Sequence, residues 1–297
     1  MNNFSIIKES IQYIESNLYE TINPTKVCKQ YDISEFHYYQ LFKHIIGMPV
    51  MEYISKRRLS DQLYRWASSN KKIPLIKVAH NSNLNSLRAV SKILKQDFNI
   101  SPRQYHKTFN GTELYPAFNN RKYTSLCENV YDKNSEIVTM PSATLIGLST
   151  ATRLTKQQHH KDILSLKKKI DMHYETIEHL STFNTHEVGL SYNTSIDLKR
   201  NDNIFFEYFR GYHVNEISKL PSDFRVFSIP RQDYLRFLTT SNSSVFNQTL
   251  KYIYSDYLVN NPIKLTNSNI NLIERYRYDR SSNHDITIEL YLPIEKK

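Results

Sequence analysis

A chain of 297 residues with 39% hydrophobic and 12% aromatic residues is long enough for about two folded domains and is unlike a disordered protein. The polar start of the sequence argues against an export signal, and the lack of an apolar run of about 20 residues argues against a membrane span. We therefore expect a cytoplasmic protein with no membrane partner. Two cysteines outside any zinc-like spacing exclude a disulfide framework and predict no structural metal or other cofactor.

The net charge of +10 is concentrated in the first third of the chain. Residues 1–112 contain 16 Lys and Arg against 8 Asp and Glu, which gives +8 and leaves +2 for the remaining residues. A basic excess confined to one region suits the phosphate backbone of a nucleic acid as partner. Each phosphate that a basic side chain neutralises releases condensed counterions, and this release increases the binding affinity. A basic surface that serves only solubility explains the charge equally well, so charge alone does not decide.

Residues 5–31 predict two helices. Apolar residues recur at helical spacing through 5–18, which predicts a first helix with one buried face. A short second helix is expected from Asn23 and Pro24, an N-cap residue followed by proline, to Tyr31.

A third helix is expected to begin after Ser34, a favourable N-cap residue, and to end before Gly47. Asp32 falls in the tight turn between the second and third helices, so residues 24–46 have the outline of a helix-turn-helix unit. A longer helix over 49–69 then links this unit to the next part of the chain.

The same outline recurs from Pro74. A short helix, a turn through 81–83 and a longer helix ending near Phe98 form a second unit, which Ser101-Pro102 follows. The two units together resemble the DNA-binding domain of the AraC family over about residues 7–109. The matching residues are Leu41, Phe42, Lys43, Gly47, Met48, Tyr53, Arg57 and Leu59 in the first unit, and Ile76, Ala79, Ser86, Val90, Lys95, Phe98, Ser101, Pro102 and Tyr105 in the second.

The sequence departs from the family pattern mainly in its turns. Asp32, Asn83 and Asn99 stand where the family has glycine, and Leu84 stands where it has an aromatic residue. Because Asp and Asn tolerate the left-handed backbone better than other non-glycine residues, we expect the turns to form.

The resemblance implies that the second helix of each unit enters a major groove of double-stranded DNA, so that one chain would occupy two adjacent grooves. Tyr38, Leu41 and Phe42 are expected in the core. Arg88 suits guanine and Gln40 suits adenine, although an ordinary solvated helix face is the alternative at each position. The candidate DNA-binding residues are Glu35, Phe36, Tyr39, Gln40, Lys43 and His44 in the first unit, and Ser86, Leu87, Arg88, Ser91, Lys92 and Lys95 in the second.

Residues 113–135 lack periodicity and are interpreted as a linker between a domain over 1–112 and a second domain over 136–297. In the second domain the order strand, helix, strand, strand occurs twice. Met140-Pro141 aligns with Ile229-Pro230 at a period of 89 residues, which indicates an internal duplication. The expected elements are strands within 137–153, 186–193, 203–214, 224–240, 272–278 and 285–294, and helices over 156–180 and 244–258.

This second region resembles the GyrI-like effector-binding domain of Rob-type regulators over about 136–295. The matching residues are Ile273, Glu274, Arg275 and Tyr276, with Asp285 and the closing Leu292, Pro293 and Ile294. Thr240, Ser241 and Asn242 replace the usual His-x-Gly, and Tyr257 stands where tryptophan is common. Two such halves would join their sheets around a cleft that takes a ligand.

The resemblance implies that Glu274 is a carboxylate facing this cleft. A carboxylate among aromatic rings suits a small amphipathic organic cation, and Tyr276 would share its strand face. Tyr192, Tyr208 and Tyr234 are further candidates for ligand binding, with ordinary packing as the alternative. For Glu274 the alternative is an ion pair with Arg275 or Arg277.

The sequence therefore predicts an α + (α+β) fold, in which an all-helical double helix-turn-helix domain precedes a duplicated β-α-β-β domain. The expected function is a DNA-binding transcription regulator, with promoter DNA, a small organic cation and RNA polymerase as partners and with no catalytic residues. A small-molecule hydrolase that uses Glu274 as a general base, and a partner-binding module, are the alternatives.

Overall fold

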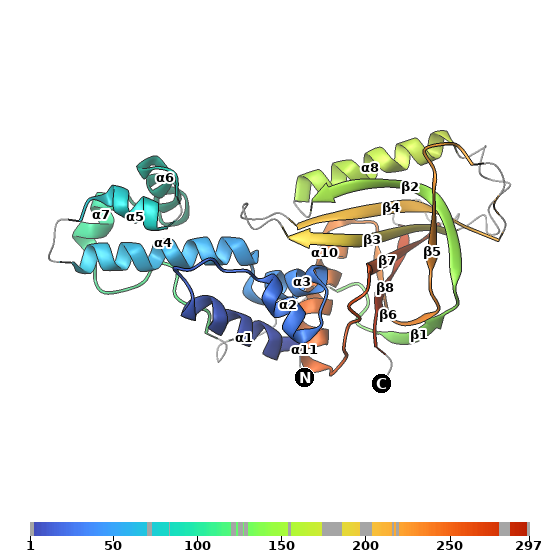
Figure 1. Ribbon diagram of the computed structural model, residues 1–297, viewed down its shortest axis with the longest axis horizontal. Coiled ribbons are helices and arrows are strands. Elements are labelled where there is room, and N and C mark those ends of the chain that lie inside the picture. The colour runs from blue at the N-terminus through green and yellow to red at the C-terminus, as the bar shows by residue number, and fades with distance from the viewer. Residues whose placement is uncertain are drawn as a thin grey trace.

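We describe the chain from a computed structural model (Figure 1). The structure describes residues 3–69, 73–82, 84–119, 123, 127, 130–153, 156–173, 186–196, 204–215, 217, 220–278 and 286–295. Helices form the N-terminal part and a large curled sheet forms the C-terminal part, so the predicted α + (α+β) class is confirmed. The N-terminal helices are α1 (Asn3–Ser16), α2 (Thr25–Tyr31), α3 (Glu35–Ile46), α4 (Val50–Ser68), α5 (Leu75–Asn81), α6 (Leu87–Phe98) and α7 (Pro102–Thr108).

The helix ends follow the predicted turn chemistry. Asp32 and Asn99 adopt the left-handed backbone, with φ of 48° and 56°, and Gly47 ends α3 with φ of 86°. The hydroxyl of Ser34 accepts a hydrogen bond from the backbone N–H of His37, as an N-cap should. Asn83, the other predicted turn residue, lies outside the described residues.

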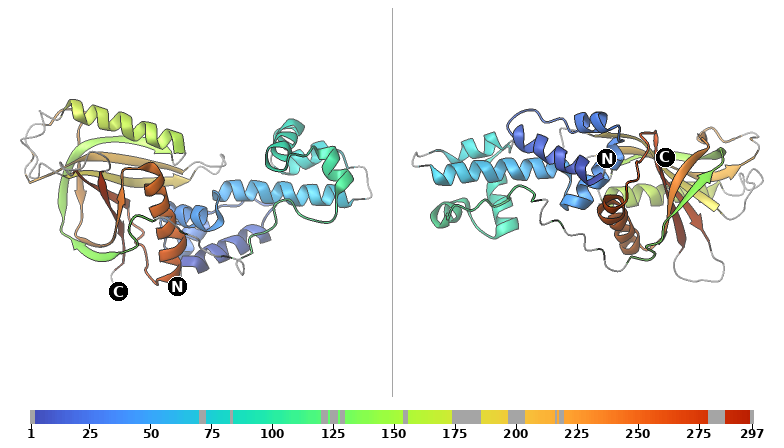
Figure 2. Two further views of the ribbon diagram at one scale, coloured as in Figure 1. Left: turned by 180° about the vertical axis from the view of Figure 1, so that it is seen from behind. Right: turned by 90° about the horizontal axis from the view of Figure 1, so that it is seen from below.

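The two helix-turn-helix units lie at opposite ends of α4 (Figure 1). The second unit has its own core, while the core of the first continues into the C-terminal part. The second unit therefore projects away from the sheet, and the first lies against it (Figure 2). The second core consists of Leu59, Leu63, Val78, Ala79, Val90, Leu94 and Tyr105.

The C-terminal part is one antiparallel sheet with the strand order β1-β6-β8-β7-β3-β4-β2-β5. The first half contains β1 to β4 and the second half β5 to β8, and the strand order is symmetric about the central β7–β3 pair. The first strand of each half pairs with a strand of the other half, β1 with β6 and β5 with β2. The matching strands β1 and β5, and β2 and β6, begin 89 residues apart, as the predicted duplication requires. The strands are β1 (Glu136–Met140), β2 (Ala143–Arg153), β3 (His186–Ile196), β4 (Ile204–Val214), β5 (Arg225–Ile229), β6 (Gln232–Thr240), β7 (Ile270–Arg277) and β8 (Thr287–Pro293).

Each half contributes one helix to the same face of the sheet (Figure 1). Helix α8 (Lys156–Met172) packs on β2 and β4, and α10 (Ser243–Tyr252) packs on β6. Helix α10 continues as a π-helix, η3 (Ile253–Tyr257), and a last turn, α11 (Leu258–Asn260). Between α8 and the α10–η3 helix lies the central β3–β7 pair, where the sequence predicted a cleft. None of the helices in the described part of the chain is long and apolar enough to cross a bilayer.

Candidate nucleic-acid interface and effector cleft

Helix α6 presents an accessible basic face. Four of its candidate DNA-binding residues are exposed to solvent: Leu87, Arg88, Lys92 and Lys95. Ser91 is half-buried, and Ser86 is the N-cap whose hydroxyl accepts a hydrogen bond from the backbone N–H of Ala89 at 3.2 Å. The second unit can therefore place the first turns of α6 against DNA without rearrangement.

Helix α3 of the first unit is different, because the side expected to face outward is buried. Phe36, Tyr39 and Gln40 are only 2%, 3% and 2% exposed, and Glu35, Lys43 and His44 are half-buried. Sequence periodicity identified the side of α3 that the first unit's own core leaves free, but it could not show that the C-terminal part covers this side. The expected exposure is therefore corrected, and the DNA-binding role of these residues stays a prediction.

The residues of α3 that contact the C-terminal part include Phe36, His37, Tyr39 and His44. The buried Gln40 lies on the same side of the helix, one turn from Phe36 and His44, and we term these five residues the docking face. The ring of Phe36 packs edge-on against Phe206 of β4, with centroids 5.9 Å apart. Tyr39 belongs to the buried cluster of α8 and β4. On the other side, His37 Nδ1 and the Tyr254 hydroxyl of η3 are hydrogen-bonded at 2.9 Å. Helix α3 thus lies between α8 and η3, beside β3 (Figure 1).

Contacts at the edge of this interface hold the first unit in place. The His44 ring stacks on Tyr254 at a centroid distance of 6.0 Å. The amide of Asn3 donates to the backbone carbonyl oxygens of Leu258 and Ile263 at 2.9 and 3.0 Å. Asp32 accepts a hydrogen bond from the side chain of Asn267 at 2.9 Å and lies 3.4 Å from the Lys264 ammonium group.

Glu274 lies on the helix-bearing face of β7 and is 4% exposed. Its carboxylate accepts hydrogen bonds from the hydroxyls of Tyr208, at 2.9 Å, and Tyr276. Burial raises the pKa of Glu274, against the lowering effect of these two hydrogen bonds and of the nearby Arg210. Opposite Glu274 on β3, a Cβ at Gly189 would fall 2.1 Å from the Tyr208 hydroxyl oxygen, so glycine makes room for this tyrosine.

The alternative pairing of Glu274 with Arg275 or Arg277 is wrong. Both arginines project to the opposite face of the sheet, because successive side chains of a strand alternate. There Arg277 forms an ion pair with the buried Glu289 at 2.6 Å, and Arg275 lies 3.9 Å from the same carboxylate. Glu274 is therefore free of any ion pair with its own strand.

Sequence analysis missed the ion pair beside Glu274. Arg210 of β4 binds Glu187 of β3 through two nitrogens, one at 2.9 Å, and both side chains are almost fully buried. The Arg210 guanidinium also lies over the Tyr276 ring, 4.3 Å from its centroid. The signal that identified Glu274, a charged residue inside an apolar strand, marks Glu187 and Arg210 as well.

This cluster has two carboxylates and one guanidinium. Burial alone would raise the pKa of Glu187, but hydrogen bonds from Arg210 and Tyr278 hold this pKa below its usual range. Glu187 is therefore an anion neutralised by Arg210. Glu274 is left with hydroxyl partners, so the cluster can accept one further positive charge.

The other two candidate tyrosines lie elsewhere. Tyr192 and Tyr234 belong to a separate cluster on the opposite face of the sheet. The Tyr192 hydroxyl donates to Glu207 at 2.7 Å, and Tyr234 packs edge-on against Tyr291. Of the five candidate ligand-binding residues, the structure brings together Glu274, Tyr276 and Tyr208.

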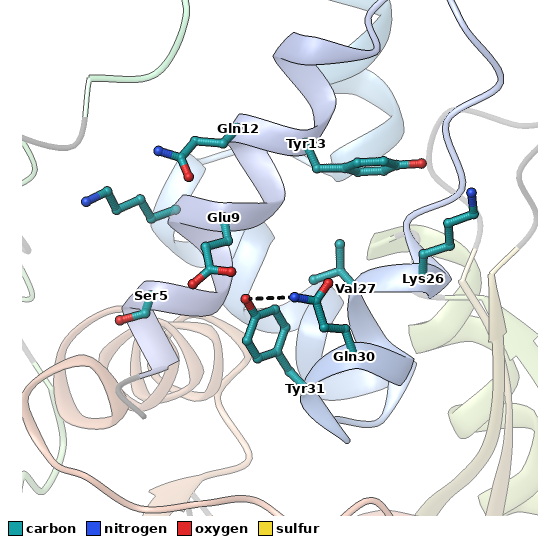
Figure 3. Close-up of a pocket in the computed structure, with 9 residues that line it drawn as sticks. Ser5, Glu9, Gln12, Tyr13, Lys26, Val27, Gln30 and Tyr31 are labelled. Carbon is teal, nitrogen blue, oxygen red and sulfur yellow. Dashed lines mark hydrogen bonds between the residues drawn. The ribbon is translucent and has the colours of Figure 1, made fainter.

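A surface hollow of about 540 Å³ lies away from these residues, between α1 and α2 (Figure 3). Its walls include Lys8, Lys26 and Glu9, together with Tyr13 and Tyr31. None of the predicted site residues lines it, and its mixed charges favour no particular ligand. The buried carboxylate of Glu274 therefore has the more specific chemistry of the two places.

The family model of integron-associated effector binding proteins, Cass2, matches residues 136–294. The match spans more than half of the chain, and the chain belongs to this family. The GyrI-like resemblance predicted from the sequence is thereby confirmed. A solved structure with a similar C-terminal fold is SAV2435 bound to tetraphenylphosphonium, with a TM-score of 0.43 and 12% identity over 55% of this chain and 94% of that one.

Relatives of the N-terminal region are named as transcription regulators. The HTH-type transcriptional activator AarP of Providencia stuartii is 28% identical over 107 residues, which are 36% of this chain and 78% of the relative. The multiple antibiotic resistance protein MarA of Escherichia coli (strain K12) is 24% identical over 102 residues, 34% of this chain and 79% of the relative. The AraC-type resemblance of the N-terminal region is confirmed as well.

Proposed function

We propose that the chain is a sequence-specific DNA-binding transcription regulator whose C-terminal domain binds a small effector. The observation that carries this proposal is the accessible basic face of α6 on a unit that projects away from the sheet. An exposed helix with Arg88 near its start suits bidentate contact with guanine, and Lys92 and Lys95 suit phosphates. The name of one relative, AarP, describes a transcriptional activator, which supports promoter DNA as the target and RNA polymerase as the protein partner.

The test begins with selection of binding sites from random double-stranded DNA by the full chain. Replacement of Arg88 by Ala should weaken binding to the selected site by about tenfold, with little change for unrelated DNA, because base contacts are worth about 1–3 kcal/mol. Gln40→Ala should act in the same way only where α3 is free to enter a groove, because Gln40 is buried in this structure. Lys95→Ala should weaken binding to both kinds of DNA, since phosphate contacts carry no sequence information. An equal loss for every sequence in Arg88→Ala would refute base recognition.

For the effector, we propose an amphipathic organic cation at Glu274. The site supports this class through a buried carboxylate that has no ion-pair partner among the described residues and that lies beside two tyrosines. Aromatic faces attract such cations by about 0.5–2 kcal/mol each. The second nearby carboxylate, Glu187, is held by Arg210, which favours binding over hydrolysis because a hydrolase that works through paired carboxylates would need Glu187 available.

A further inference from the structure

The buried state of α3 conflicts with a role in DNA recognition. A major groove about 12 Å wide admits one helix, but not a helix whose outward side carries a domain. Phe36, Tyr39 and Gln40 can contact base edges only after α3 leaves the C-terminal domain, whereas α6 is already accessible. With α3 docked, the chain can therefore approach DNA through its second unit alone.

Helix α3 also contributes to the packing around Glu274. The two tyrosines that donate to Glu274 belong to different buried clusters, Tyr208 to the cluster of α8 and Tyr276 to that of α10. The docking face contributes to both, through Tyr39 in the first cluster and Phe36 in the second. A ligand that displaces these tyrosines would therefore disturb packing to which α3 contributes.

The interface has features of a contact that can open. Among the described residues, neither His37 Nε2 nor Gln40 Oε1 has a hydrogen-bond partner, although both atoms are buried. Such unsatisfied atoms weaken an interface, because each would be solvated if the surfaces separated. The partner surface includes the π-helix η3, a rare element that is frequent at functional sites.

We propose that α3 exchanges between two partners, the effector cleft of its own chain and a DNA major groove, and that a ligand at Glu274 favours the released form. This inference rests on the proposed function. Because α3 cannot be in both places, docking limits recognition to α6, and release allows both units to bind. The ligand and DNA then favour the same form of the chain, and each increases the affinity for the other.

The test compares two tyrosine variants of the full chain. Tyr254→Phe removes the hydroxyl that is bonded to His37 and keeps the ring that fills the interface. Docking should weaken, and affinity for the selected DNA site should rise about five- to thirtyfold, since the docked form would then bury one more unsatisfied group. Tyr252→Phe is the control, because its hydroxyl contacts the Lys133 carbonyl, away from α3. It should leave DNA affinity unchanged.

A reversible cross-link provides the opposite perturbation. Asp32 and Asn267 are exposed and hydrogen-bonded across the interface, so an Asp32→Cys/Asn267→Cys protein can be joined by a short thiol-specific linker. The native Cys28 is buried, which raises its pKa to about 12 and keeps it unreactive, and Cys127→Ser removes the other thiol. The linked protein should bind the selected site at least about tenfold more weakly and protect one groove instead of two. Reduction of the linker should restore both properties.

The outcomes separate the two proposals. Equal affinity and equal protection in linked and reduced protein would overturn the exchange of α3 and leave DNA binding intact. Failure of the two cysteines to link, with each single variant reacting normally, would show that α3 is not docked and would also overturn it. Absence of specific DNA binding in every form would refute the proposed function, and the exchange with it.

Discussion

The Glu274 carboxylate lies within a small group of buried charges and aromatic rings. Arg210 neutralises Glu187 and covers the Tyr276 ring, so the internal cation already uses part of the aromatic surface. Glu274 keeps two hydroxyl donors and a raised pKa, which reflects the cost of a buried carboxylate without a counter-charge. A cationic ligand would supply that counter-charge, so we expect the proposed site to select ligands by their charge.

Glu274 can be tested by thermal denaturation of the full chain with tetraphenylphosphonium as the probe. At a probe concentration about a hundredfold above Kd, the melting temperature should rise by about 5 °C or more. Glu274→Gln should abolish the rise, because the amide keeps the shape and removes the charge. Glu207→Gln, which alters a carboxylate bonded to Tyr192 on the other face, is the control and should keep the full shift. An undiminished shift in Glu274→Gln would refute the assignment of Glu274.

The individual residues also show where sequence reasoning ends. Glu274 and Tyr276 share a strand face, as a spacing of two predicts, and Tyr208 joins them across the sheet. Tyr192 and Tyr234 do not, because the sequence does not reveal which of the two faces of a strand meets the helices. The ion pairs of Arg210 and Glu289 depend on strand order, which the local pattern does not contain.

At the scale of elements, helix boundaries and the duplication were predictable and the docking of α3 was not. Capping residues such as Ser34 and Ser101, together with the turn at Asp32, are local signals that fix where helices begin and end. The period of 89 residues recurs in the strand positions. Docking depends on contacts more than 150 residues apart in the sequence, such as His37 with Tyr254 and Phe36 with Phe206, and no local pattern records them.

We expect two histidines to make the position of α3 sensitive to pH. Burial lowers the pKa of both His37 and His44 to about 3, from an ordinary value of 6.5, and the charges of Lys43 and Lys251 add to the effect at His44. The Tyr254 hydroxyl and the Phe36 ring face His37, and the Tyr254 ring also stacks on His44. Above pH 6.5 both histidines are neutral in either form, and docking has its full strength. Below pH 6.5 the released form binds protons that the docked form excludes, so docking weakens as pH falls.

The expected change is large enough to measure directly. Between pH 7.5 and pH 5.5 the docking constant should fall about ten- to a hundredfold, about tenfold from the fully buried His37 and up to as much again from the half-buried His44. Spin labels at Lys29→Cys and Asn247→Cys would report the separation of the two surfaces. A His37→Gln/His44→Gln protein should lose the pH response, and His106→Gln, on α7, should keep it. A distance that is constant over this range in the parent protein would contradict the role of the two histidines.

At the scale of the whole molecule, the chain places one DNA-binding unit outside the influence of the sheet and the other directly on it. The long helix α4 separates the units, so release of α3 can occur without disturbance of the core around α6 (Figure 1). The second unit would supply a constant part of the DNA affinity and the first a part that the effector controls. Full occupancy by both units would place them in adjacent major grooves, about one helical turn apart.

Effector control of DNA binding is tested most directly by the affinity of the full chain for its selected DNA site, measured with and without saturating tetraphenylphosphonium. The cation should raise the affinity at least about fivefold, the size of a typical coupling between sites, and should extend protection from one groove to two. Glu274→Gln should show neither effect. A DNA affinity that is identical with and without the bound cation would contradict effector control of DNA binding.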